Sequence, residues 1–228
     1  IGQAPQVTNV IISGSQSLHD PFSFDSVDGS GSQLGTVPVG LADTISIVFS
    51  ENVNVAADSL YVVGLRTFNL PELAEFSYDA LSHTATWRFE GWSLGDQYIL
   101  ALSETVTDED GNWLDGEWTN PAAITTSNSA VSEFPSGDGD PGGWFSFVMN
   151  LLPGDANGNA IVDSDDLDIL LNNYEGLVGA EFTQGDFDGD GDVDGDDLND
   201  LLANFDWDLS AIIVRADFDG DYDVDAAD

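Results

Sequence analysis

Three acidic segments, spaced 31 residues apart, dominate the last third of this chain. Loop one spans 155–166, loop two 186–197 and loop three 217–228, and oxygen-bearing side chains occupy positions 1, 3, 5, 9 and 12 of each. Position 8 is always valine, and position 7 can offer its backbone carbonyl. One loop that supplies about six to eight oxygens suits Ca²⁺, because Mg²⁺ prefers a tighter octahedron with its own waters. The pattern predicts two to three bound calcium ions.

The predicted ligands are side chains, except at position 7, where the backbone carbonyl is expected to bind. In loop one they are Asp155, Asn157, Asn159, Ile161, Asp163 and Asp166. In loop two they are Asp186, Asp188, Asp190, Asp192, Asp194 and Asp197. In loop three they are Asp217, Asp219, Asp221, Asp223, Asp225 and Asp228. Glycine normally allows positive φ at position 6, which is Ala160 in loop one and Tyr222 in loop three, so loop two is expected to bind most tightly.

Apolar residues at helical spacing follow loops one and two. They are Leu167, Leu170, Leu171 and Tyr174 after loop one, and Leu198, Leu201, Leu202 and Phe205 after loop two. Each unit is therefore a loop followed by a helix, with no helix leading into the loop. Loops one and two are expected to pair through Val162 and Val193, which leaves Val224 of loop three without a helix after it.

These loop-helix units resemble the type I repeats of dockerins rather than complete EF-hands. The resemblance rests on the string Gly-Asp-x-Asn/Asp-Gly-x-x-x-Val-Asp-x-x-Asp-Leu and covers 154–228. It implies a small α-helical, EF-hand-like calcium domain over 153–228, with a third repeat that is truncated where dockerins have two. In that family, positions 10 and 11 help to read a cohesin partner. Here those positions are small or charged, unlike the usual pattern, which disfavours cohesin docking.

The first part of the chain, 1–152, has short alternating or apolar runs separated by turn residues, which predict β-strands. The expected strands are Val7–Ser13, Thr44–Phe49, Leu60–Leu65, Glu75–Tyr78, Thr84–Phe89, Gln97–Leu102 and Trp144–Leu151. About seven antiparallel strands over this length favour a sandwich, and an up-and-down barrel is the alternative. The expected fold is therefore multidomain: an all-β sandwich over 1–152, followed by the small calcium domain.

The first part resembles a bacterial Ig-like module of surface-layer and adhesin proteins. The matching segments are Ile45–Val53, Gln97–Leu102 and Val106–Gly116, the last with a Val-x-Asp-x-x-Gly-Asn-x-Leu turn. The resemblance implies a passive structural or adhesive sandwich and supplies no catalytic residue. Asp108, with its neighbours in that turn, is either a further calcium site or part of the turn signature.

The chain has 43 acidic residues against three arginines and no lysine. Such a negative field excludes nucleic acid and anionic membranes as partners, since both bind basic patches. No apolar run is long enough for a membrane span, so no membrane insertion is expected. The start at Ile1 and the low-affinity type of loop lead us to expect a secreted bacterial protein, extracellular or at the cell surface, where calcium is plentiful.

No nucleophile elbow, zinc-protease or phosphate-loop motif is present, so a non-enzymatic structural or adhesive role is expected. A protein partner is expected, through self-association or through a cohesin-like receptor. Self-association would follow if Ala4–Ser13 added as a strand to a neighbour's sheet and built a filament. Carbohydrate is an alternative ligand, because Trp92, Trp113 and Trp118 lie in or near predicted turns.

Overall fold

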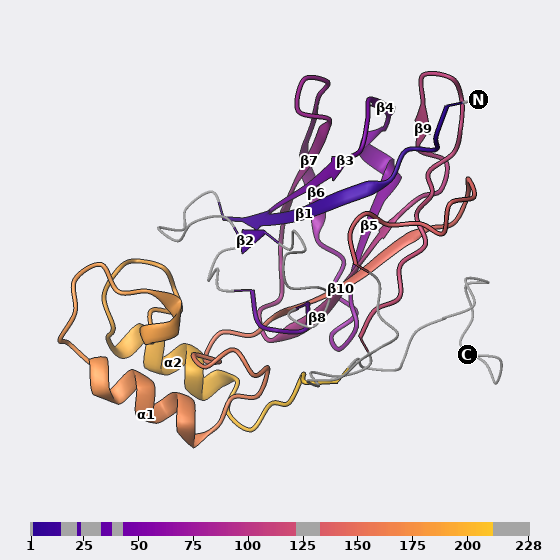
Figure 1. The fold of residues 1–228 in the computed structure, drawn as a ribbon. Helices are drawn as coiled ribbons and strands as arrows, with labels where there is room; N and C mark the ends of the chain where they lie inside the picture. The colour runs from indigo at the N-terminus through magenta and orange to yellow at the C-terminus, as the bar shows by residue number, and fades with distance from the viewer. Residues whose placement is uncertain (1, 15–21, 24–32, 38–42, 122–132, 212–228) are drawn as a thin grey trace.

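The computed structural model describes residues 2–14, 22–23, 33–37, 43–121 and 133–211 (Figure 1). Loop three lies outside these residues, so its ligands, Asp217 to Asp228, remain a prediction. The first part of the described chain consists of β-strands, and the second part contains two α-helices. The order of elements therefore follows the order predicted from the sequence.

Within the described residues, ten β-strands precede the helices. They are β1 Val7–Ser13, β2 Phe22–Ser23, β3 Thr44–Phe49, β4 Val53–Asn54, β5 Leu60–Gly64, β6 Glu72–Asp79, β7 Thr84–Glu90, β8 Asp96–Leu102, β9 Thr107–Asp108 and β10 Phe145–Leu151. A 3₁₀ turn, η2 Ala57–Ser59, precedes β5. All the predicted strands are present, and β1 and β3 have the predicted bounds.

The strands form a five-stranded sheet in the order β2-β1-β3-β7-β6, a three-stranded sheet β10-β8-β5 and a small β4-β9 pair. Each of these pairings is antiparallel. One hydrophobic core contains Ile47 and Trp87 from the first sheet and Leu100 and Phe147 from the second. Two antiparallel sheets that share one core are consistent with the predicted β-sandwich.

Burial explains why most strands alternate and why β10 does not. In β3, Ile45, Ile47 and Phe49 are buried while the residues between them are half-buried, as expected when one face meets the core. In β10, Val148 on the other face is also buried, because it lies in a small cluster with Leu34. The apolar run of β10 therefore reflects cover on both faces.

β1 lies inside the five-stranded sheet, between β3, which pairs with it from Val7 to Ser13, and β2, which pairs with Ile11 and Ile12. The segment is thus used partly within its own sheet, and the expectation that Ala4–Ser13 adds to a neighbour's sheet stays a prediction. β6 is an edge strand of this sheet. It carries Glu72, Glu75 and Asp79, and such charges disfavour edge-to-edge pairing of sheets.

After β10 the chain forms the helical unit, which we define as residues 152–211. It contains α1 Ser164–Asn173, the 3₁₀ turn η3 Phe182–Gln184 and α2 Gly195–Ala203. The two helices lie together beside the ends of β8 and β10 (Figure 1). A second hydrophobic core lies between them and includes Leu170 and Leu201. Among the described residues, no helix has the length and apolar character needed to cross a membrane.

Candidate metal centre

Loops one and two have the same local conformation. The side-chain oxygens at positions 3 and 5 each accept a hydrogen bond from the amide two residues later. In loop one, the amide of Asn159 donates to Asn157 (3.1 Å) and the amide of Ile161 donates to Asn159 (2.8 Å). In loop two, the amide of Asp190 donates to Asp188 (3.1 Å) and the amide of Asp192 donates to Asp190 (3.0 Å). At position 9, Asp163 and Asp194 cap α1 and α2 through 2.8 Å bonds. Loops one and two therefore each end by starting a helix.

The aspartates at positions 1 and 12 are buried in both loops. Asp155, Asp166 and Asp186 are 0% exposed, and Asp197 is 1% exposed. In each loop, position 12 accepts hydrogen bonds from backbone amides at both ends of the loop. The distances are 3.1 and 2.9 Å in loop one and 2.7 and 2.8 Å in loop two. These bonds join the carboxylate at position 12 to the backbone at both ends of the loop, so the first and last candidate ligands lie close together.

Burial makes the ionised form of these carboxylates costly. Desolvation raises the pKa of Asp155 to about 6, against the opposing effect of hydrogen bonds from Thr36 and Ala160. Desolvation, with repulsion from Asp197, Asp190 and Asp186, raises the pKa of Asp188 to about 6 as well. The pKa values of Asp166 and Asp192 are raised for the same primary reason. A bound cation would lower all of these pKa values, because opposite charge favours the carboxylate.

In loop two the carboxylates converge. Oxygens of Asp186, Asp188 and Asp190 lie within 4.8 Å of one another, and so do oxygens of Asp192, Asp194 and Asp197. The side chain of Asp192 thus joins a cluster, although the sequence pattern assigned only its carbonyl as a ligand. Loop one has amide oxygens at positions 3 and 5 instead. Both loops offer only oxygen atoms, which fits a hard divalent cation such as Ca²⁺.

The two loops do not pair through their position-8 valines as predicted. The amide of Val162 donates to the carbonyl of Trp207, and the amide of Asp206 donates to the carbonyl of Val162, both at 2.9 Å. The carbonyl of Val193 accepts from the amide of Glu175 at 2.8 Å. Each loop therefore pairs with the segment that follows the other repeat's helix, and the amide and carbonyl of Val162 and the carbonyl of Val193 have partners other than the facing valine.

The helix ends repeat this exchange. The side-chain amide of Asn173, at the end of α1, donates to the carbonyl of Gln184, just before loop two, at 2.8 Å. The side-chain amide of Asn204, after α2, donates to the carbonyl of Pro153, just before loop one, also at 2.8 Å. Donors and acceptors are each 31 residues from their counterparts. Loops one and two are therefore one interlocked unit, in which each repeat supports the other's loop.

An arginine of the sandwich contacts this unit. The guanidinium of Arg66, after β5, lies 3.3 Å from the ring centroid of Trp207, in cation-π geometry. The backbone of Arg66 is fixed by buried Asp96, which accepts from its amide at 2.8 Å. Trp207 also provides the carbonyl that pairs with loop one. The sandwich therefore touches the segment that closes loop one.

Asp108, Trp92 and Trp118 make structural contacts within the sandwich. Both carboxylate oxygens of Asp108 accept from Asn112, at 2.8 and 2.7 Å, which lowers the pKa of Asp108 and closes the turn. Trp92 and Trp118 pack edge-on or tilted against core aromatics. Trp113 is 53% exposed, so it alone of the three presents a large ring surface to a ligand.

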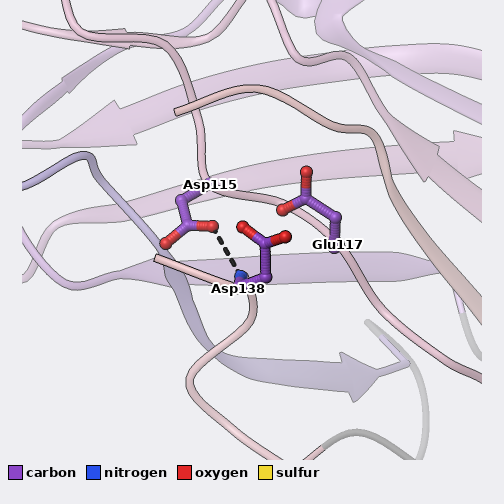
Figure 2. A group of neighbouring side chains, drawn as sticks. All are labelled: Asp115, Glu117 and Asp138. Atoms are coloured by element: carbon purple, nitrogen blue, oxygen red, sulfur yellow. Dashed lines mark hydrogen bonds between the residues drawn. The ribbon is translucent and has the colours of Figure 1, made fainter. Parts of the chain in front are cut away.

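Figure 2 shows a further acidic cluster in the sandwich, formed by Asp115, Glu117 and Asp138, whose oxygens lie within 4.8 Å of one another. Asp115 is buried and accepts from the side chain of Gln6 and from the amide of Asp138, both at 2.8 Å. It thereby ties the N-terminal segment to the loop before β10. Desolvation raises the pKa of Glu117. Sequence reasoning missed this cluster because its members have no motif spacing.

No family model matches the chain, and no curated protein matches it. The most informative residues are the buried aspartates of loops one and two, which lie in two reciprocally paired repeats.

Proposed function

We propose that this chain is a calcium-binding structural or adhesive protein without enzymatic activity. The observation that carries the proposal is the burial of Asp155, Asp166 and Asp197, which are at most 1% exposed. The ion pairs found among the described residues join Arg88 to Glu75 and Glu90 on the sandwich, and so do not include these three aspartates. A buried carboxylate is costly unless it is paired or bound to a metal. Calcium would supply the missing positive charge and complete the helical unit.

In this proposal, loops one and two each hold one ion, and loop three holds a third. The helical unit is then a dockerin-like calcium domain, and the sandwich is an Ig-like module that it orients. Aspartate at position 12 is shorter than the glutamate of sensor loops, which supports a structural site rather than a switch. Low-affinity structural loops suit millimolar extracellular calcium, so the proposed location is outside a bacterial cell or on its surface.

Calorimetric titration of calcium into the calcium-depleted full chain tests the proposal, with far-UV circular dichroism recorded alongside. We expect two to three bound ions and an increase in helical signal. Asp166→Asn and Asp197→Asn should each remove one ion, whereas Asp58→Asn, an exposed change on the sandwich, should remove none. A wild-type chain that takes up no calcium at millimolar concentration would refute the proposal.

A protein partner is the second candidate, and one observation favours it. Leu171 on α1 and Leu202 on α2 occupy the same place in the two repeats and are 54% and 55% exposed. Leucines exposed at equivalent positions offer a partner apolar contacts that calcium would hold in place. Light scattering with and without calcium tests self-association, and a pull-down with cohesins tests a cohesin-like receptor. A strictly monomeric chain that retains no cohesin would count against both.

A further inference from the structure

The sandwich donates a hydrogen bond to the first ligand position of loop one. The hydroxyl of Thr36 donates to carboxylate oxygen Oδ2 of Asp155, across 119 residues of sequence. The same oxygen accepts from the amide of Ala160 at 2.8 Å, and the other oxygen, Oδ1, accepts from the amide of Asn159 at 3.0 Å. Of these three donors to Asp155, Thr36 is the one that lies outside the helical unit.

Thr36 is held in place by β10. Its backbone forms a parallel bridge with Asn150, and the amide of Val37 donates to the Asn150 carbonyl at 3.0 Å. The side chain of Asn150 donates to the carbonyl of Leu34 at 2.6 Å. Gln33, also buried, donates to the carbonyl of Val148 at 2.7 Å. Residues 33–37 therefore lie along β10 at several points, which leaves the Thr36 hydroxyl little freedom.

The same asparagine closes a circuit back to loop one. Asn150 donates to the carbonyl of Leu209 at 3.1 Å, and the amide of Leu209 donates to the carbonyl of Ala160 at 2.8 Å. Ala160 in turn donates to Asp155, which accepts from Thr36. All five residues are at most 7% exposed. This buried circuit connects Asp155 by hydrogen bonds to both β10 and the segment after α2.

We propose that Thr36 is a positioning residue for calcium in loop one, and that the circuit couples occupancy of that loop to residues 33–37 of the sandwich. This inference rests on the proposed calcium function. A ligand carboxylate keeps its orientation through hydrogen bonds from outer groups, and Thr36 provides one to Asp155. Because coupling is reciprocal, the packing of 33–37 on β10 raises calcium affinity, and calcium in turn orders 33–37.

Hydrogen-exchange mass spectrometry on the full chain, over a calcium titration, reads loop one, loop two and residues 33–37 separately. Thr36→Val removes the hydroxyl with little change of volume, and Thr36→Ser is the matched variant that keeps it. For Thr36→Val we expect the calcium midpoint of loop one to rise about tenfold, as for other outer-shell changes. The midpoint of loop two should not move. Calcium should protect 33–37 in the wild type and in Thr36→Ser, and not in Thr36→Val.

Three outcomes would overturn the inference while leaving the proposed function intact. In one, calcium protects both loops but Thr36→Val leaves the loop-one midpoint unchanged. In another, exchange in 33–37 of the wild type does not respond to calcium. In the third, Thr36→Val shifts both loops equally, which indicates general destabilisation. If neither loop of the wild type responds to calcium, the proposed function fails as well.

Discussion

Acidification should weaken calcium binding at loop one and, in the absence of calcium, should stabilise the protein. Both effects arise from Asp155, which is fully buried and whose pKa is raised by desolvation to about 6 from 3.8. Below its pKa the side chain is protonated in the calcium-free fold, so calcium has to displace a proton. At about pH 5, one unit below that pKa, the affinity of loop one should be about tenfold lower than near pH 7.5.

The effect on stability has the opposite sign. Between the unfolded pKa of 3.8 and the folded pKa of about 6, the folded state of Asp155 binds more protons than the unfolded state. The contribution of Asp155 to the free energy of unfolding is therefore fully present below the unfolded pKa, and it is lost as pH rises through the folded pKa. Since one pKa unit corresponds to about 1.4 kcal/mol, going from about pH 7.5 to about pH 5 should add about 1.4 kcal/mol to the free energy of unfolding.

Urea denaturation of the calcium-depleted chain, followed by tryptophan fluorescence at several pH values, measures this term. Asp155→Asn removes the titration and is nearly isosteric, so its pH dependence should be flatter by that amount. Near pH 7.5, calcium should stabilise the wild type more than Asp155→Asn. Equal pH slopes for the two calcium-depleted proteins, or equal stabilisation of both by calcium, would refute this account of Asp155.

Two further predictions concern backbone geometry. Ala160 has φ of 59° at position 6 of loop one, where Gly191 has φ of 93° in loop two. Positive φ is costly for a residue with a Cβ atom, so Ala160→Gly should stabilise the calcium-free chain by about 1 kcal/mol and Gly191→Ala should destabilise it by about as much. Denaturation measures both changes, and a change of the same sign in both variants would contradict the argument. A methyl group at Gly95, φ 72°, would overlap Trp207, whereas one at Gly91, φ 78°, meets nothing. Gly95→Ala should thus lose about 1–3 kcal/mol more stability than Gly91→Ala, and equal losses would show that this contact tolerates the methyl group.

Alternating or continuous apolar runs, bounded by turn residues, were enough to predict the principal strands, because each has at least one face on the core. They could not predict β2, β4 and β9, since two residues are too few to show a period of two. The predicted strand Glu75–Tyr78 is longer in the structure, where it begins at Glu72. The register shift between Leu73 and Glu75 breaks the alternation there, which hid the first residues of β6.

The clustering of oxygens within loop two also follows from local spacing, because spacing determines which side chains a single loop presents; the ligand sets themselves stay a prediction. How the loops associate was not predictable. Val162 and Val193 are equivalent in the sequence, but their partners lie after the other repeat's helix, and such non-local pairing leaves no local signal. The same holds for Thr36, an ordinary threonine whose hydroxyl meets Asp155 only once the sandwich has formed.

The return of the chain from α2 to loop one has a consequence for synthesis. All the proposed ligands of loop one have been made by Asp166, but the backbone partners of Ala160 and Val162 lie between Asp206 and Leu209. During translation, loop one would therefore emerge with a full set of oxygens and without the scaffold that aligns them. Its competence to bind calcium should appear only when Leu209 has left the ribosome. Under the proposed calcium function, the smallest stretch of chain that aligns the oxygens of loop one is thus the pair of repeats, and not loop one by itself.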